Sequence, residues 1–283
     1  MPIEHRWVDA KDGMKCQISI LRLDSIHPVS GGNKTFKLYE NVTHFFDGNF
    51  DGIASVGGQF SNHIAALAQI GKDFAIPTVA FIRGEKAAVP TITVRRAMEN
   101  GMQIVYVSRE RYREIRIKGN PMIDFSEYKN YFFIPEGGSN DLGVDGSKNI
   151  VNFIPADYTH VLCAVGTGAT LKGIASILLD HQKIIGVKVV EAKQEEFIYK
   201  NIDAITHDKI ILNAEYLFGG YARQHKVLDD FVMKWNEKDS IKIEPIYTGR
   251  LFFAAQQLIK QNFFQASSNI LLIHSGGLQY VVH

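Results

Sequence analysis

Short apolar runs alternate with amphipathic segments along most of the chain, and this alternation limits the possible folds more than any other feature. The runs expected to form strands are residues 52–56, 77–82, 103–107, 131–134, 160–165 and 184–190. The segments with helical spacing are residues 62–70, 91–100 and 170–180. Strands and helices in alternation predict parallel sheets that are covered by helices on both faces.

The alternation occurs in two series, one in each half of the chain, which predicts two α/β lobes. No repeat period and no low-complexity segment interrupts the series. In a protein with two such lobes, a ligand is expected in the cleft between them. The stretch Glu136–Gly146 is the richest in turn-forming residues, so it is expected to be a connection between lobes, a ligand loop, or both.

Composition argues against several classes of protein. Of the 283 residues, 46% are hydrophobic, and 31 Lys and Arg face 30 Asp and Glu. No basic stripe for nucleic acid stands out, because the basic segment Arg109–Lys118 is interrupted by Glu110 and Glu114 and is expected to be a solvated helix face. No stretch approaches the ~20 apolar residues that span a bilayer, and Met1–Trp7 lacks the apolar core of a signal peptide. We therefore expect a soluble, cytoplasmic protein.

Cysteine and histidine usage argues against disulfide and metal sites. Cys16 and Cys163 are far apart, so they do not form a disulfide framework, and Cys163 lies in an apolar run where it is expected to be a small buried side chain. The ten histidines are scattered without ligand spacing. No metal site is expected.

The segment Ser30–Leu38, with the sequence Ser-Gly-Gly-Asn-Lys-Thr-Phe-Lys-Leu, is the first that could carry chemistry. Its glycines allow a tight turn and a close approach of a ligand to the backbone. Lys34 and Lys37 begin a helix, where the helix dipole favours anions, so the two cations indicate an anionic ligand. A lysine beside another cation also loses its proton more easily and can form a Schiff base. A surface turn before an amphipathic helix explains these residues equally well.

The segment Ser55–His63 follows an expected strand and opens an expected helix, where free backbone N–H groups can bind a carboxylate or phosphate. Ser61 is a natural N-cap, and that structural role alone would explain it. Two glycines precede it, however, and the polar side chains of Gln59, Asn62 and His63 surround it. A cap does not need so many polar neighbours.

A third segment, Val165–Thr170, again joins a strand to a helix. Its small residues let backbone amides surround a phosphate, and the hydroxyls of Thr167 and Thr170 can add hydrogen bonds. The Gly-Lys-Ser/Thr of a P-loop is absent, as is the spacing of a dinucleotide fingerprint. Two aromatic segments, Phe218–Tyr221 and Pro245–Arg250, and the small-residue turn Ile273–Gly277 accompany these three.

Taken in order from Leu21 to Gly277, these segments resemble the pyridoxal-phosphate enzymes of the tryptophan synthase β superfamily. The branch that they resemble holds 1-aminocyclopropane-1-carboxylate deaminase and D-cysteine desulfhydrase. Gly-Gly-Asn-Lys at 31–34 and Gly-Gly-Gln-Phe-Ser-Asn-His at 57–63 are specific to that branch. Cysteine synthases and serine/threonine dehydratases carry the lysine in a Ser-x-Lys context instead.

The resemblance implies fold type II, an α/β fold with two open, twisted, parallel-type sheet domains flanked by helices. A large cofactor-binding domain is expected at residues 1–40 and 140–283, and a small domain at residues 41–139. The resemblance also implies a homodimer, pyridoxal 5'-phosphate as the cofactor, and a small amino acid as the substrate.

The resemblance further implies roles for single residues. Lys34 would bind the cofactor as a Schiff base and move protons at the substrate α-carbon. Ser61, Tyr247 and Tyr221 would be the other catalytic residues. The remaining cofactor contacts would be Lys37, Asn62, Gly166, Thr167, Gly168, Ala169, Thr170, Thr248 and Ser275. The substrate contacts would be Ser61, Asn62, His63 and Ser139, with Asn140 in the same turn as Ser139.

Two positions bear on the reaction. The deaminases of this branch place an acidic residue after the tyrosine of the Pro-x-Tyr motif and a leucine before the final Gly-Gly, where this chain has Thr248 and Ser275. Both resemble the desulfhydrases. A carboxylate partner keeps the pyridine nitrogen protonated and makes the ring a strong electron sink, whereas a hydroxyl does not. Expulsion of a β leaving group needs the weaker sink, and opening of a cyclopropane needs the stronger one.

These features predict β-elimination from a small amino acid, as in D-cysteine desulfhydrase, giving pyruvate, ammonia and sulfide. Phe36 departs from the family pattern, which usually has Arg or another residue between the two lysines. Three alternatives stay open: a 1-aminocyclopropane-1-carboxylate deaminase that yields 2-oxobutyrate and ammonia, a catalytically weak relative that binds the cofactor or an amino acid, and a phosphate-binding protein unrelated to pyridoxal.

Overall fold

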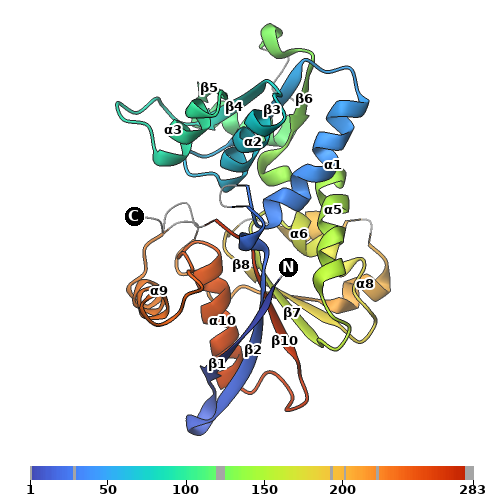
Figure 1. The fold of residues 1–283 in the computed structure, drawn as a ribbon, viewed down its shortest axis with the longest axis vertical. Helices are drawn as coiled ribbons and strands as arrows, with labels where there is room; N and C mark the ends of the chain where they lie inside the picture. The colour runs from blue at the N-terminus through green and yellow to red at the C-terminus, as the bar shows by residue number, and fades with distance from the viewer. Residues whose placement is uncertain are drawn as a thin grey trace. The chain divides into compact units, whose positions relative to one another are not determined.

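The computed structural model describes residues 2–27, 30–118, 125–191, 194–200, 202–220 and 223–277. The chain divides into two compact units, each with its own sheet (Figure 1). Unit 1 contains Met1–Asn33 and Ser147–His283, and unit 2 contains Lys34–Gly146. The small domain expected at residues 41–139 lies inside unit 2, which also contains most of the first helix.

Unit 1 is built on a six-stranded sheet with the order β1-β2-β10-β7-β8-β9. Its strands are β1 (Ile3–Asp9), β2 (Lys15–Arg22), β7 (His160–Val165), β8 (Lys183–Lys188), β9 (Ile210–Asn213) and β10 (Ile270–His274). β1 pairs with β2 in the antiparallel direction, and the remaining pairs are parallel. The sheet therefore joins both parts of the chain, because β2 lies directly beside β10.

Helices cover both faces of this sheet, as the alternation of side chains along its strands requires. The helices of unit 1 are α6 (Ala169–Ala175), α7 (Gln194–Tyr199), α8 (Ala204–Lys209), α9 (Lys226–Lys238) and α10 (Thr248–Lys260). On one face Leu162 belongs to the same core as Leu251 of α10. On the other face, a Cβ added at Gly186 would lie 2.2 Å from Leu171 and 2.7 Å from Val165. Glycine at this position therefore lets α6 approach the sheet closely.

Unit 2 contains a four-stranded parallel sheet with the order β5-β4-β3-β6. Its strands are β3 (Gly52–Gly57), β4 (Thr78–Arg83), β5 (Gln103–Val107) and β6 (Tyr131–Ile134). β3 and β4 are almost wholly buried. A strand that is buried on both faces needs a continuous apolar sequence, which explains why these strands are visible as apolar runs.

The helices of unit 2 are α1 (Asn33–Asp47), α2 (Asn62–Asp73), α3 (Ile92–Glu99), α4 (Arg109–Lys118) and α5 (Asp141–Lys148), which ends just inside unit 1. Leu38 of α1 packs with Leu67 of α2 and Ile53 of β3 in one core. Tyr112 and Ile115 of α4 pack in a second core. The first core includes Leu38, which explains why unit 2 begins before residue 41.

The predicted α/β class with two sheet domains is confirmed. The helix expected at residues 170–180 is wrong in length, because α6 ends at Ala175. The buried side chain of Gln182 accepts a hydrogen bond from the backbone of Leu179 (3.0 Å) and donates one to the carbonyl of Tyr158 (3.0 Å). These bonds satisfy the backbone without a further helical turn. In the described part of the chain, no helix combines the length and apolar character needed to cross a membrane.

Candidate functional site

Unit 1 brings two of its predicted segments into backbone contact, namely the glycines before Lys34 and the turn after β10. The backbone N–H of Asn33 donates to the carbonyl of Ser275 (3.2 Å). Gly32 has a φ of +89°, and a Cβ there would lie 2.0 Å from the same carbonyl oxygen. Only glycine has both the required conformation and the required size at this position. The Gly-Gly pair therefore serves close packing of two backbones.

The side chain of Asn33 connects the same segment to the loop between β7 and α6. Its Nδ2 donates to Thr170 Oγ1 at 2.8 Å, and the two residues are 7% and 5% exposed. This contact joins residues that are separated by 137 positions in the sequence. The residue directly before Lys34 is thus fixed to the Gly166–Thr170 loop.

The Gly166–Thr170 loop packs closely against Tyr247. A Cβ added at Gly166 would lie 3.3 Å from Tyr247 Cε1 and 3.8 Å from its hydroxyl oxygen. Gly168 has a φ of +100°, and a Cβ there would lie 2.7 Å from Ile198. Gly168 is therefore required at its position, whereas a side chain at Gly166 would displace the ring of Tyr247 by a few tenths of an ångström. The backbone of this small-residue loop therefore lies close to an aromatic ring on one side and to Ile198 on the other.

Tyr247 is held in place by the buried carboxylate of Glu244. The Oε1 atom of Glu244 accepts from the backbone N–H groups of Tyr247 and Thr248 (both 2.8 Å), and its Oε2 accepts from Ile246 (2.7 Å). Thr248 is fully buried, and its hydroxyl accepts from the backbone N–H of Glu244 (2.9 Å). The hydroxyl of Thr248 thus helps to cap α10. The sequence did not indicate Glu244, although an acidic residue shortly before a helix is a recognisable capping signal.

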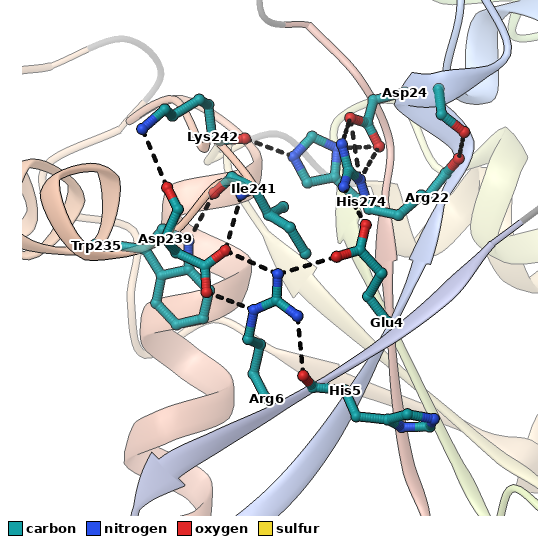
Figure 2. A network of polar contacts seen from close by, with 11 residues as sticks. Glu4, His5, Arg6, Arg22, Asp24, Trp235, Asp239, Ile241, Lys242 and His274 are labelled. Atoms are coloured by element: carbon teal, nitrogen blue, oxygen red, sulfur yellow. Dashed lines mark hydrogen bonds and ion pairs between the residues drawn. The ribbon is translucent and has the colours of Figure 1, made fainter.

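A buried polar network fixes the end of β10, where Ser275 follows (Figure 2). Asp24 accepts from Arg22 at 2.7 Å, and its Oδ1 lies 3.2 Å from Nδ1 of His274. Nε2 of His274 donates to the carbonyl of Lys242 at 2.8 Å. Burial opposes the charge of Asp24, but the hydrogen bonds from His274 and Arg22 outweigh it and hold the pKa of Asp24 well below its usual value. These contacts give Ser275 a fixed starting position.

Unit 2 places both lysines in the first turns of α1, as predicted. Lys34 is partly exposed. Lys37 is only 3% exposed, and its amine donates to the carbonyl of Gly137 at 3.1 Å. Gly138 has a φ of +67°, and a Cβ there would lie 3.4 Å from Cβ of Lys37. The predicted glycine-rich turn at 136–138 therefore packs directly against α1.

Ser61 and His63 lie at the start of α2. Ser61 is its N-cap, because its Oγ accepts from the backbone N–H of Ile64 at 3.3 Å. His63 is 2% exposed, and its Nε2 lies 2.9 Å from Oγ of Ser55. Burial, and then the charges of Lys34 and Lys37, lower the pKa of His63 to about 3. The imidazole is therefore neutral near pH 7.

Ser139 and Asn140 stabilise the turn that precedes α5. Ser139 Oγ donates to the carbonyl of Glu136 at 3.0 Å. Asn140 accepts from the backbone N–H of Gly143 at 2.9 Å and donates to Asn41 at 2.7 Å. The described contacts of both residues are thus internal to unit 2.

Tyr221 lies outside the described residues. The preceding Gly220 is held by Arg250, a fully buried arginine of α10, whose Nη2 donates to the carbonyl of Gly220 at 2.7 Å. Its Nη1 donates to the carbonyl of Val189 at 2.8 Å. The sequence pointed to both segments but not to this bond, because it joins residues 30 positions apart.

Comparison with known proteins identifies the family. A family model described as "Pyridoxal-phosphate dependent enzyme" matches residues 10–276. The chain belongs to this family. Its cofactor is pyridoxal phosphate, as the resemblance predicted. The residues described above fit that cofactor, since unit 1 supplies a loop of small and hydroxyl residues between a strand and a helix, and two lysines begin α1.

The relatives agree with the predicted branch. A "Putative 1-aminocyclopropane-1-carboxylate deaminase" of Thermotoga maritima is 27% identical over 282 residues, which is 92% of this chain and 88% of the relative. The "Bifunctional D-cysteine desulfhydrase/1-aminocyclopropane-1-carboxylate deaminase, mitochondrial" of Arabidopsis thaliana is 25% identical and covers 97% of this chain and 75% of its own.

Solved structures show the same fold. An "ACC deaminase homologue" superposes with a TM-score of 0.73 at 22% identity, covering 93% of this chain and 85% of that one. A hydrogen sulfide-producing enzyme from Fusobacterium nucleatum superposes with a TM-score of 0.72 at 15% identity, covering 98% and 85%. At these identities the likeness concerns the fold alone.

Proposed function

We propose that the protein breaks down a small D-amino acid with a β leaving group, of which D-cysteine is the example, to pyruvate, ammonia and the released group. The observation that carries this proposal is Ser275 at the position where the deaminases of the branch have leucine. Ser275 is partly exposed at the end of β10. A hydroxyl facing the pyridine nitrogen favours the less demanding elimination over opening of a cyclopropane.

Thr248 also favours elimination over opening of a cyclopropane, although we do not assign its hydroxyl to the pyridine ring. It stands where the deaminases have an acidic residue, and its hydroxyl is occupied by Glu244. Its proposed contribution is therefore to hold Tyr247 at the start of α10. Ser275 is then the hydroxyl that we assign to the ring nitrogen.

We also assign contacts of the cofactor to single residues and to one loop. We assign its aldehyde to Lys34, its phosphate to Lys37 and to the Gly166–Thr170 loop, and its ring hydroxyl to Asn62. When bound, it supplies an electron sink for the charge that develops at the substrate α-carbon. Asn33, the residue before Lys34, is fixed to this loop, since its side chain bonds to Thr170.

The remaining steps belong to side chains of this chain. Ser61 binds the substrate carboxylate at the start of α2, together with the backbone N–H groups there, and Asn62, His63 and Ser139 complete the substrate contacts. The amine of Lys34 removes the α-proton, which requires it to lie within ~3 Å of that proton. Tyr247, and Tyr221 with it, acts near the leaving atom, where Tyr247 donates a proton. Water then converts the released enamine to pyruvate and ammonia.

The identity of the cofactor lysine can be tested by chemical trapping. Reduction of the full-length protein with borohydride, followed by peptide mapping, is expected to place the pyridoxyl label on Lys34 and not on Lys37. A Lys34→Ala variant should lose the label and the absorbance of the bound cofactor, while Lys37→Ala should keep a label on Lys34 with weaker cofactor binding. A label on any other lysine contradicts the assignment.

The substrate class can be tested by product analysis. Purified protein is expected to release pyruvate from D-cysteine and from β-chloro-D-alanine, and Lys34→Ala should release none. If neither compound yields pyruvate, the proposed reaction is wrong. Release of 2-oxobutyrate from 1-aminocyclopropane-1-carboxylate would establish the second candidate, which the name of the Thermotoga maritima relative favours. A labelled protein that turns over neither compound would be a cofactor-binding relative.

We also propose that two copies of the chain assemble into a homodimer, on the basis of the family resemblance. Light scattering after size-exclusion chromatography is expected to give twice the mass of 31.8 kDa. A mass of one chain at micromolar concentration would contradict this.

A further inference from the structure

Glu244 carries a carboxylate that is 1% exposed and that the proposed reaction does not use. Both of its oxygens face hydrogen-bond donors. The backbone N–H groups of Tyr247 and Thr248 donate to Oε1, and that of Ile246 donates to Oε2. The hydroxyl of Thr248 lies 3.2 Å from Oε1 and adds a further donor. An ionised carboxylate only accepts, whereas a neutral acid carries a proton of its own. These donors therefore favour the ionised form.

The start of α10 supplies electrostatic support for this charge. The positive end of the helix dipole lies at its N-terminus, where the carboxylate binds the first N–H groups. Burial nevertheless raises the pKa of Glu244, and the bonds from Thr248, Ile246 and Tyr247 oppose this rise without cancelling it. Because the folded pKa lies above the unfolded value, the charged form costs stability at neutral pH. A charge placed at such a cost is typical of functional sites.

The neighbouring elements contribute no ion pair to this carboxylate in the part of the chain that the structure describes. Before α10, the amine of Lys242 bonds to two backbone carbonyls. From β10, Nε2 of His274 bonds to the carbonyl of Lys242, and within α10 the guanidinium of Arg250 bonds to two other carbonyls. α9 contributes the apolar side chain of Val232, which a Cβ at Gly249 would meet at 2.6 Å. Hydrogen bonds from the backbone thus govern the charge.

The backbone around Glu244 is packed too tightly to absorb a change in its bonds. The side-chain amide of Asn236 bonds to both the N–H and the carbonyl of Ile243, each at 2.9 Å. A Cβ added at Gly249 would lie 2.7 Å from the carbonyl oxygen of Glu244. Both ends of the capped turn are therefore fixed. A change in the charge of Glu244 consequently acts on the part between them, which carries Tyr247.

The ring of Tyr247 lies against the loop between β7 and α6, since a Cβ at Gly166 would lie 3.3 Å from its Cε1. We propose that Glu244 is a positioning residue that is ionised at neutral pH, and that its negative charge sets the separation between this ring and the Gly166–Thr170 loop. Protonation weakens the bonds to the turn, because charge-assisted hydrogen bonds are about twice as strong as neutral ones, and the ring then moves. The effect on turnover rests on the proposed role of Tyr247, but the link between charge and ring position does not.

The charge and the ring can be observed together by carbon NMR of the purified full-length protein. Glutamate labelled with ¹³C at Cδ reports the ionisation of Glu244, and tyrosine labelled at Cε reports the ring of Tyr247. The two signals are assigned by their loss in Glu244→Gln and in Tyr247→Phe. Glu244 is expected to be ionised at pH 7 and to titrate above the usual value of ~4.3. The Tyr247 signal should shift with the same midpoint, and Glu244→Gln should abolish this shift.

Turnover of D-cysteine gives a second measurement. The kcat of the wild type is expected to fall as the pH drops through that midpoint, whereas the free energy of unfolding should not fall there, because protonation removes the cost of the buried charge. Glu244→Gln should lower kcat by ~10- to 100-fold at pH 7 with little change in KM, and it should lack the decline on the acid side. Glu244→Asp keeps the charge and should keep the decline.

Asp203→Asn is the matched control, because Asp203 is an exposed carboxylate that caps α8 through the N–H of Thr206 at 2.6 Å. It should leave kcat and the Tyr247 signal unchanged. A neutral Glu244 at pH 7, a Tyr247 signal that stays constant during its titration, or equal losses of kcat in Glu244→Gln and Asp203→Asn would each overturn the inference. Failure to release pyruvate from either compound would instead overturn the proposed function and leave the NMR link intact.

Discussion

Gly166 is the residue at which the loop between β7 and α6 meets Tyr247. The absence of a side chain there has a steric cause, because a Cβ would press on the tyrosine ring at 3.3 Å. At this distance the ring has to move by a few tenths of an ångström. Such a movement affects two assigned contacts at once, because the loop is assigned to the phosphate and the tyrosine is assigned to the leaving atom.

Gly166→Ala is therefore expected to weaken binding of pyridoxal phosphate by about five- to thirty-fold, which corresponds to ~1–2 kcal/mol. The measurement is a cofactor titration followed by absorbance. Gly58→Ala is the matched control, because it adds the same methyl group at a position with no atom within 4 Å. Equal affinities for the two variants would show that the ring adapts without loss.

Asn33 is a second residue whose importance follows from one contact. Its amide joins α1 to Thr170 in a buried position. Asn33→Ala removes the donor and is expected to lower the free energy of unfolding by about 1 kcal/mol, while it slows incorporation of the borohydride label at Lys34. Asn41→Ala is a suitable control, because Asn41 also donates to a buried backbone carbonyl of α1, at 2.7 Å, but its other described contact is with Asn140 and not with a loop residue. Slower labelling in both variants would mean that stability alone governs the effect.

The elements α2 and α3 begin with equivalent caps, which allows a structural role to be separated from a catalytic one. Ser61 accepts from Ile64 at 3.3 Å, and Thr91 accepts from Val94 at 3.3 Å. Thr91 also donates to the carbonyl of Gln59. Its removal should therefore destabilise the protein at least as much as removal of Ser61 does.

Ser61→Ala and Thr91→Ala are each expected to lower the free energy of unfolding by ~1 kcal/mol, measured by urea denaturation. Only Ser61→Ala should in addition lower the rate of pyruvate release by ~100-fold, because only Ser61 is assigned to the substrate. If both variants lose activity in proportion to stability, then Ser61 is a cap and nothing more.

Among the helices and strands, those with a strong local pattern could be predicted from the sequence. Strands β3, β4, β7 and β8 were predicted because strands that are buried on both faces have apolar sequences. β1 was missed because it is an edge strand with exposed polar side chains, among them His5 and Asp9, which lack that pattern. Helix α6 was predicted too long because the buried side chain of Gln182 replaces helical hydrogen bonds, which no local pattern reveals.

For the candidate site, the sequence was sufficient to select segments but not contacts. Lys34, Ser61 and the Gly166–Thr170 loop stand out because glycines and several polar side chains cluster at each of these turns. The bond between Asn33 and Thr170 joins residues 137 positions apart and depends on tertiary structure, so it was not predicted. The capping of α10 by Glu244 is local, and its signal in the sequence was overlooked. The assigned roles of all these residues stay predictions.

At the scale of the whole molecule, the polar network of Figure 2 makes the free energy of unfolding depend on pH. The pKa of Asp24 is held low in the folded protein by His274 and Arg22, against the effect of burial. Because the folded pKa lies below the unfolded value of ~4, the resulting stability is present above that value and is lost as the pH falls toward the folded pKa.

Asp24→Asn is expected to lower the free energy of unfolding by about 2 kcal/mol at pH 7, since it removes the carboxylate beside the fully buried His274, while Arg22 keeps its contact with Glu4. It should also flatten the loss of stability of the wild type below pH ~4. Thermal unfolding from pH 2 to 7 measures both effects. Asp9→Asn, which breaks the exposed pair with Lys15, is the control and should change little. Parallel pH profiles for the wild type and Asp24→Asn would contradict this assignment.

The position of β2 beside β10 imposes an order on events during synthesis. All four strands of unit 2 come from one uninterrupted stretch, from Gly52 to Ile134, so its sheet can close while the ribosome is still translating the rest. The sheet of unit 1 cannot form in this way. β2 pairs in parallel with β10, so this pair forms only after Ile270–His274 has left the ribosomal exit tunnel. A nascent chain stalled before residue 270 would consequently carry one finished sheet and one that lacks its centre.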